Sequence, residues 1–273
     1  MKKKLIYAGL LLLGMAATTG CSNEEGLEQV MNNGKTFEAV IENVEARTSV
    51  SDDYKVLWTE GDKFDIWNDA TKAGILELKS GAGSTSGTFG VPEGEEAFEV
   101  AEGMTAFFPA TAKESTSKSY TFVTSYSNQE TDAPMLGTFT NGKFSFSLLT
   151  AMVRVVVTDV SAGNATLTIT AADNLMLTGN AALNDQNTLN EPTGGTNTVT
   201  VTVNNQTEGA TLTFDVPVPA QTYTGGLSVK LTTGDNNTEV FSKKTNEFTA
   251  STGKIYVFGA KTVSVDSLSL IHI

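Results

Sequence analysis

The sequence predicts an all-β protein built from two tandem β-sandwich domains. Its composition favours strands, because the 273 residues include about 40 threonines and 25 glycines but only 6 prolines. Apolar and polar residues alternate with a period of two from residue 36 onward, most strictly in Thr166–Thr170 and Val199–Val203. No segment after residue 20 carries apolar residues at helical spacing over three turns. Strands are therefore expected throughout the chain after residue 35.

The expected strands are short and are separated by turns rich in glycine and asparagine. Thr36–Val44 is the first, and Tyr54–Trp58 is expected to pair with Lys63–Trp67 as a hairpin across Glu60–Asp62. The others are Ile75–Leu78, Thr85–Phe89, Met104–Pro109, Ser119–Thr124, Phe144–Ser147, Met152–Thr158, Thr166–Thr170, Val199–Val203, Leu212–Val216, Leu227–Thr232, Val240–Ser242 and Lys254–Val265. About sixteen strands are too many for one sandwich. Because Thr131–Asn141 alternates least, we predict domains at 36–138 and 139–267.

The N-terminus has the pattern of an export signal. A basic start, Met1–Lys4, precedes the apolar stretch Leu5–Ala17. Thirteen helical residues reach about 20 Å, which is less than the hydrocarbon core of about 30 Å, so residues 1–20 are predicted to be a signal peptide. Small residues up to Gly20 precede the only cysteine, Cys21, which resembles a lipoprotein cleavage site between Gly20 and Cys21. Lipid on Cys21 would anchor the chain to a membrane. An ordinary signal peptide with an incidental cysteine is the alternative.

The tether and the charge point to a cell surface. Residues 21–35 are interpreted as a flexible tether, and Glu24 and Glu25 resemble the surface-export signal of Bacteroidetes lipoproteins. This predicts the outer leaflet of the cell outer membrane, although any solvated linker can carry two acids. Cleavage would remove three lysines and no acid, so the net charge of −13 would become −16. So acidic a chain is not expected to bind nucleic acid.

The side chains offer little for catalysis or metal binding. With one cysteine and one histidine, the chain has no Cys/His cluster for zinc, and His-dependent catalysis would have to use His272. The acids Glu60, Asp62 and Asp65 are interpreted as a solvated strand face rather than a catalytic pair. Asp52–Asp53 and Asp235–Asn237 are interpreted as turns rather than calcium loops. We expect no enzyme, no cofactor and no metal.

The last six residues look foreign to the chain. Leu268–Ile273 can be encoded by CTGTCTCTTATACACATC, which resembles a transposon end used in sequencing libraries. We interpret residues 268–273 as adapter sequence and expect the natural chain to continue past about Ser267. A genuine apolar end strand is the alternative.

One block of residues resembles a known family. An Arg-Thr pair at Arg47 and a short acidic stretch precede a Trp-x-x-Gly-Asp motif and two alternating apolar residues. The motif positions are Val56, Trp58, Gly61, Asp62, Phe64 and Ile66. This resembles the N-terminal signature of the fimbrillin family of Bacteroidetes. Shorter stretches resemble later parts of the same family: Asp132–Gly137, Phe144–Val157, Val216–Ala220 and Gly253–Tyr256.

The resemblance implies two transthyretin-like sandwiches that serve as a stalk or tip subunit of a type V pilus in cell adhesion. It also implies an Arg-specific protease that cuts after Arg47, just beyond the strand Thr36–Val44. Loss of that strand would open a groove for a strand of the next pilus subunit. Alternatives remain at each step. The alternative interpretation of Arg47 is an exposed cation in a loop. Trp58 and Trp67 are interpreted either as core aromatics or as platforms on which a sugar stacks. The alternative function is a non-polymerising surface lipoprotein that binds glycans or host ligands.

Overall fold

A computed structural model describes residues 30–31, 35–42, 45–46, 56–113, 115–127, 132–234 and 238–262. The all-β prediction is confirmed, since these residues form 22 strands and no helix. In this part of the chain no helix has the length and hydrophobicity to cross a membrane. Several predictions fall outside the described residues: the signal peptide with Gly20 and Cys21, Arg47, the turns at 52–53 and 235–237, and residues 268–273.

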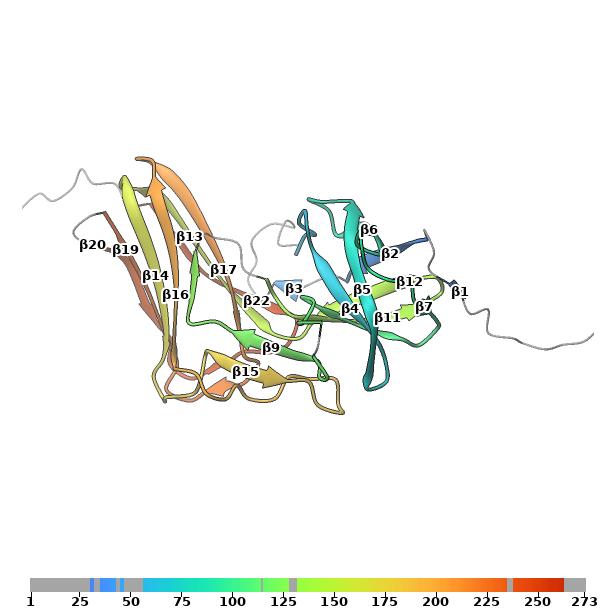
Figure 1. The fold of residues 1–273 in the computed structure, drawn as a ribbon. Coiled ribbons are helices and arrows are strands. Elements are labelled where there is room, and N and C mark those ends of the chain that lie inside the picture. The colour runs from blue at the N-terminus through green and yellow to red at the C-terminus, as the bar shows by residue number, and fades with distance from the viewer. Residues whose placement is uncertain are drawn as a thin grey trace, which may run out of the picture.

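The first unit is a closed barrel of seven strands with an aromatic core. Its strands lie on the right in Figure 1. Around the barrel they are β11 (Met135–Thr140), β12 (Lys143–Leu148), β2 (Thr36–Ile41), β6 (Ser86–Gly90), β5 (Thr71–Ser80), β4 (Lys63–Asn68) and β8 (Thr105–Phe108), which pairs back to β11. The β12–β2 pair is parallel and the others are antiparallel. Alternate side chains point inward, so that Phe64, Phe89 and Phe144 are fully buried in the barrel.

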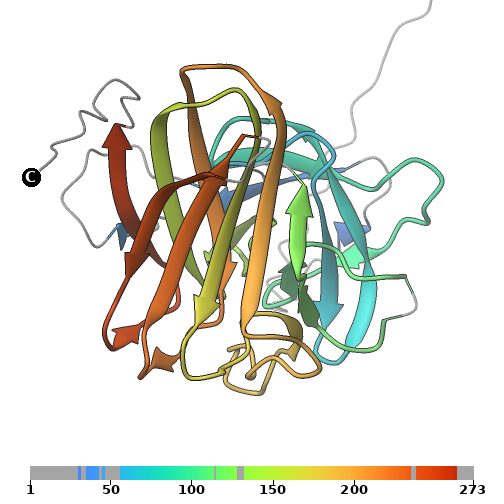
Figure 2. The ribbon, with the colours of Figure 1, turned by 90° about the vertical axis from the view of Figure 1, so that its left-hand side faces the viewer.

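The second unit is a sandwich of two sheets. The five-stranded sheet, seen face-on in Figure 2, contains β10 (Ser125–Ser127), β16 (Thr198–Gln206), β14 (Gly163–Ala171), β19 (Leu227–Thr233) and β20 (Thr238–Lys244), in that order. The four-stranded sheet contains β17 (Ala210–Val218), β13 (Ala151–Val160), β22 (Lys254–Thr262) and β3 (Glu45–Ala46). Their inner faces bury one aliphatic core with Val153, Leu167, Phe214 and Leu231.

Three two-stranded sheets complete the fold. They are β1 (Val30–Met31) with β7 (Glu99–Val100), β15 (Gly179–Ala182) with β9 (Ser119–Phe122), and β18 (Thr222–Tyr223) with β21 (Phe248–Thr249). The β9–β15 pair lies between the two units in Figure 1. A third buried cluster holds Trp67, Phe107, Tyr120, Phe122 and Leu149. It joins barrel strands to β9 and to the β12–β13 turn, so the two units are packed together rather than strung on a linker.

The structure corrects the predicted hairpin and places the unit boundary differently. Trp58 lies outside any strand, and its backbone forms hydrogen bonds with Gly83 and Ser84 in the β5–β6 turn. These bonds hold its ring inside the barrel. The strand expected to be its partner, β4, pairs instead with β5 and β8. The division predicted between residues 138 and 139 falls within β11, whose pairing with β12 keeps the chain in the barrel up to Leu148.

Candidate functional site

The strand expected to precede a protease site is β2, which is one of the strands that form the barrel. β2 lies between β12 and β6, and its side chains alternate so that Phe37, Ala39 and Ile41 are buried. The Phe37 ring meets Phe139 at a centroid distance of 5.6 Å and Phe144 at 6.1 Å, both edge-on. β2 therefore fills a slot that is apolar inside and offers ladder hydrogen bonds on both sides.

The same stretch of chain also reaches the second unit. At the end of β2, the Ile41 N–H donates to the Thr85 carbonyl, and the N–H of the next residue, Glu42, donates to the Phe146 carbonyl, each at 2.8 Å. β3 then pairs in parallel with the first residues of β22, with Ala46 opposite Ile255. The described residues 36–42 and 45–46, called the β2–β3 segment below, thus belong to the barrel and to the edge of the sandwich. Arg47 follows directly, outside the described residues.

The signature tryptophan lies against the β2–β3 segment. The Trp58 side chain is 1% exposed, which places it in the core as the strand pattern predicts and away from any sugar-stacking surface. Its indole Nε1–H donates to the Ala39 carbonyl of β2 at 3.3 Å. The ring also packs edge-on against Phe89 at 4.9 Å and Phe146 at 5.3 Å. Trp58 therefore contacts the β2 backbone and both strands that flank β2.

The other signature residues shape the turn that carries Trp58 into the barrel. Gly61 has φ of +89°, a conformation that L side chains rarely adopt. The Asp62 N–H donates to the Thr59 carbonyl at 3.1 Å, and the Thr59 N–H donates to Asp62 Oδ2 at 2.7 Å. Val56 is half-buried and packs on the barrel core. These three residues have structural roles.

Asp65 contradicts its predicted place on a solvated face, because it is completely buried. Its Oδ1 pairs with Lys72 Nζ at 2.7 Å, and its Oδ2 accepts hydrogen bonds from the N–H and Oγ1–H of Thr111 at 2.8 and 2.6 Å. The pairing of β4 with β5 shifts register between the position of Asp65 and the position that faces Lys72. Lys72 also donates to the Thr111 and Ala112 carbonyls. This group fastens the loop after β8 and leaves no free carboxylate. Sequence reasoning missed it because Thr111 is 46 residues from Asp65.

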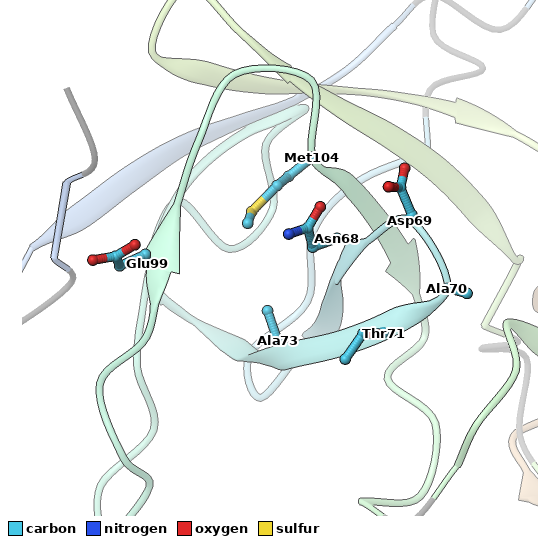
Figure 3. A pocket seen from close by; sticks show the side chains of 7 residues that line it. All are labelled: Asn68, Asp69, Ala70, Thr71, Ala73, Glu99 and Met104. Atoms are coloured by element: carbon cyan, nitrogen blue, oxygen red, sulfur yellow. The ribbon is translucent and has the colours of Figure 1, made fainter. Parts of the chain in front are cut away.

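A hollow of about 670 Å³ lies at the β4–β5 turn, and Figure 3 shows its lining. Asn68, Ala73 and Met104 point into it, whereas the carboxylates of Asp69 and Glu99 point away from it and from each other. Paired carboxylates for acid–base chemistry are therefore not assembled here. In the described part of the chain no three His, Cys, Asp or Glu side chains gather into a possible metal site.

Comparisons with known proteins support the fold. No protein-family model matches the sequence, and no curated protein matches it. A crystal structure from Bacteroides uniformis, described as a "putative cell adhesion protein", is 17% identical with a TM-score of 0.52, covering 84% of this chain and 92% of that chain. A second, described in the same words, from Bacteroides ovatus, is 11% identical with a TM-score of 0.53, covering 87% of this chain and 93% of that one. The chain therefore shares its fold with these two proteins along most of its length.

Proposed function

We propose that this chain is a fimbrillin-like adhesion protein: a structural subunit of a type V pilus, exported as a surface lipoprotein through Cys21 and assembled by donor-strand exchange. The observation that carries the proposal is the position of the β2–β3 segment. It forms one strand of the barrel and one edge strand of the sandwich, and it ends directly before Arg47. The two solved structures with the same fold support the adhesion role, since both are described in those terms.

The physics of the slot explains why a cut would matter. While the segment is covalently attached, its effective concentration at the slot is high, and an incoming strand does not compete. A cut after Arg47 makes residues up to 47 a separate peptide that can leave by dilution. Its departure would unpair the facing edges of β6 and β12 and uncover Phe139 and Phe144, which Phe37 contacts. An extended apolar segment of another subunit would satisfy both the edges and the rings.

The chain makes the test unusually selective, because the sequence contains only two arginines, Arg47 and Arg154. Arg154 lies on β13, which is hydrogen-bonded to β17 and β22, and its guanidinium pairs with Asp215 at 2.7 Å between Nη2 and Oδ2. Its side chain is 14% exposed, so a protease cannot reach it in the folded protein. Within residues 1–267, an Arg-specific protease should therefore cut the folded natural precursor only after Arg47.

Polymers stable in cold detergent are expected after this cut. Arg47→Lys is the matched control, since it should resist the Arg-specific protease and stay monomeric, yet be cut by trypsin. Cutting without polymer formation would contradict pilus assembly and favour the alternative of a surface lipoprotein that captures ligands as a monomer. One observation favours that alternative: a polar cleft lies where the barrel meets the sandwich.

A further inference from the structure

A carboxylate and an amine lie together under the loop that follows β8. Asp65 of β4 is completely buried, and the side chain of Lys72, near the start of β5, is 10% exposed. The loop contacts both groups, and its Ala110 N–H donates to the Lys63 carbonyl at 2.8 Å. Phe107, which faces Asp65 across the pairing of β4 with β8, is fully buried as well. The two groups are therefore shielded from water.

The two oxygens of the Asp65 carboxylate have different surroundings. Oδ2 accepts two hydrogen bonds from Thr111, as described above. Oδ1 lies 2.7 Å from Lys72 Nζ but makes no hydrogen bond with any described residue, so this contact is close without being aligned. Lys72 Nζ donates to the Thr111 and Ala112 carbonyls at 3.1 and 3.2 Å. Its third N–H is left for the carboxyl side, where Thr111 Oγ1 lies 3.4 Å away.

We infer that Lys72 and Asp65 condense to an amide, an isopeptide bond that joins β4 to β5. One proton passes from Nζ to Oδ1, and the ion pair becomes an amine and a carboxylic acid, which are easier to bury than ions. The Nζ lone pair attacks Cγ, and negative charge develops on Oδ2, where the two Thr111 donors stabilise it. A second proton moves from Nζ to Oδ1, the bond between Cγ and Oδ1 breaks, and water leaves. The amide keeps one N–H and Oδ2, so atoms and charges balance.

The surrounding hydrogen bonds suit the product as well as the reactants. Oδ2 would keep both bonds from Thr111 as the carbonyl oxygen of the new amide, and the remaining N–H would keep one of the two loop carbonyls. The oxygen that leaves as water is Oδ1, the buried atom that lacks a hydrogen bond. The fold also holds the nucleophile against the group that it attacks, which replaces a chance encounter by a fixed geometry.

A neighbouring ion pair on the same two strands lacks these features and serves as a control. Lys63 Nζ lies 2.9 Å from Glu77 Oε1, but the two side chains are 45% and 25% exposed, and Glu77 also pairs with Lys79 at 2.6 Å. Water keeps such a pair ionised, so it should not condense. The isopeptide bond is also independent of strand release, because β4 and β5 pair with β8 and β6 and not with β2. Its absence would leave the proposed pilus assembly untouched.

The test is mass spectrometry of the uncut mature chain before and after folding. Chain recovered unfolded from inclusion bodies in urea should have its full mass, and after refolding it should be lighter by one water. The loss should map to the tryptic peptide 64–79, because an amide on Lys72 prevents trypsin from cutting there. A second cut, on the N-terminal side of Asp69, should leave the two halves of this peptide joined through Asp65 and Lys72.

Three variants assign the reaction to these residues. Lys72→Arg keeps the positive charge without an amine nucleophile, so it should refold and keep its full mass. Thr111→Val removes one of the two donors to Oδ2 and should slow the loss of water about a hundredfold, whereas Thr111→Ser should react like the unmodified chain. The inference is overturned if the refolded chain keeps its full mass, if Lys72→Arg also loses water, or if Thr111→Val reacts as fast as Thr111→Ser.

Discussion

Replacing Trp58 tests whether the signature residue belongs to the barrel core, and the structure sets the size of the effect. The side chain is 1% exposed and is surrounded by Phe64, Phe89, Phe108 and Phe146, with ring centroids between 4.9 and 6.3 Å away. Removing a buried tryptophan costs about 3–5 kcal/mol, and each aromatic pair adds about 0.5–1.5 kcal/mol beyond area burial. A closed barrel collapses poorly around a cavity, so Trp58→Ala should cost about 4–5 kcal/mol.

Trp58→Phe separates the ring from its hydrogen bond. It keeps an aromatic side chain but removes the Nε1–H that donates to the Ala39 carbonyl, so it should cost about 1–2 kcal/mol. Urea unfolding of the mature chain, monitored by circular dichroism, measures both losses in the free energy of unfolding. They are calculated from the change in the urea midpoint, with the dependence of the free energy on urea concentration held constant. A loss below about 1 kcal/mol for Trp58→Ala, in a protein that still folds, would show that the ring is not core and would restore the sugar-stacking interpretation.

Three further outcomes are expected. Asp65→Asn and Lys72→Met should each cost about 3–5 kcal/mol because each leaves a buried charge unpaired, and the double variant Asp65→Asn with Lys72→Met should cost much less than their sum; additive losses in urea would contradict direct pairing. Burial raises the pKa of Tyr120, so above about pH 10 the unfolded chain loses a proton that the folded chain keeps, and stability falls as pH rises; Tyr120→Phe should flatten this fall, and an unchanged slope would refute the assignment. Cys21→Ala should abolish metabolic labelling with a fatty-acid analogue and free the protein from membranes, whereas surviving label would end the lipoprotein proposal.

Strict alternation of apolar and polar residues predicts strands correctly where one face of a sheet is exposed to solvent. Thr166–Thr170 and Val199–Val203 were predicted as strands and lie within β14 and β16, with their apolar residues in the sandwich core. The threonines form the outer face, where Thr170 and Thr198 face each other with Oγ1 atoms 3.1 Å apart. Such a strand can be predicted from the sequence alone, because its side chains are alternately buried and exposed with a period of two.

The pattern failed where a residue is buried for a reason that is not local. Trp58 is buried as predicted, but residues 56–58 form no strand, and the backbone of Trp58 bonds to the β5–β6 turn instead. Asp65 alternates like an exposed acid, yet Lys72 and the distant Thr111 make its burial possible. Thr150, Asn190 and Gln221 line one hollow but come from separate loops, and nothing in their spacing predicts this.

The packing between the units has a consequence for strand release. The cluster of Trp67, Phe107, Tyr120, Phe122 and Leu149 contains no residue of β2 or β3. The pairing of β9 with β15 and of β10 with β16 likewise joins the two halves of the chain without them. Losing the β2–β3 segment should therefore open the barrel while leaving the barrel and the sandwich docked.

The chain carries its own reporters for this prediction, because it has two tryptophans. Trp58 contacts β2 and should meet water when the segment leaves, whereas Trp67 lies 1% exposed in the cluster between the units and should not. After the cut at Arg47 and removal of the peptide, fluorescence of the Trp67→Phe variant, which reports Trp58 alone, should shift to longer wavelength. Fluorescence of the Trp58→Phe variant, which reports Trp67, should stay unchanged. A shift in both would mean that the segment also holds the two units together, and a shift in neither would mean that it remains bound after cleavage.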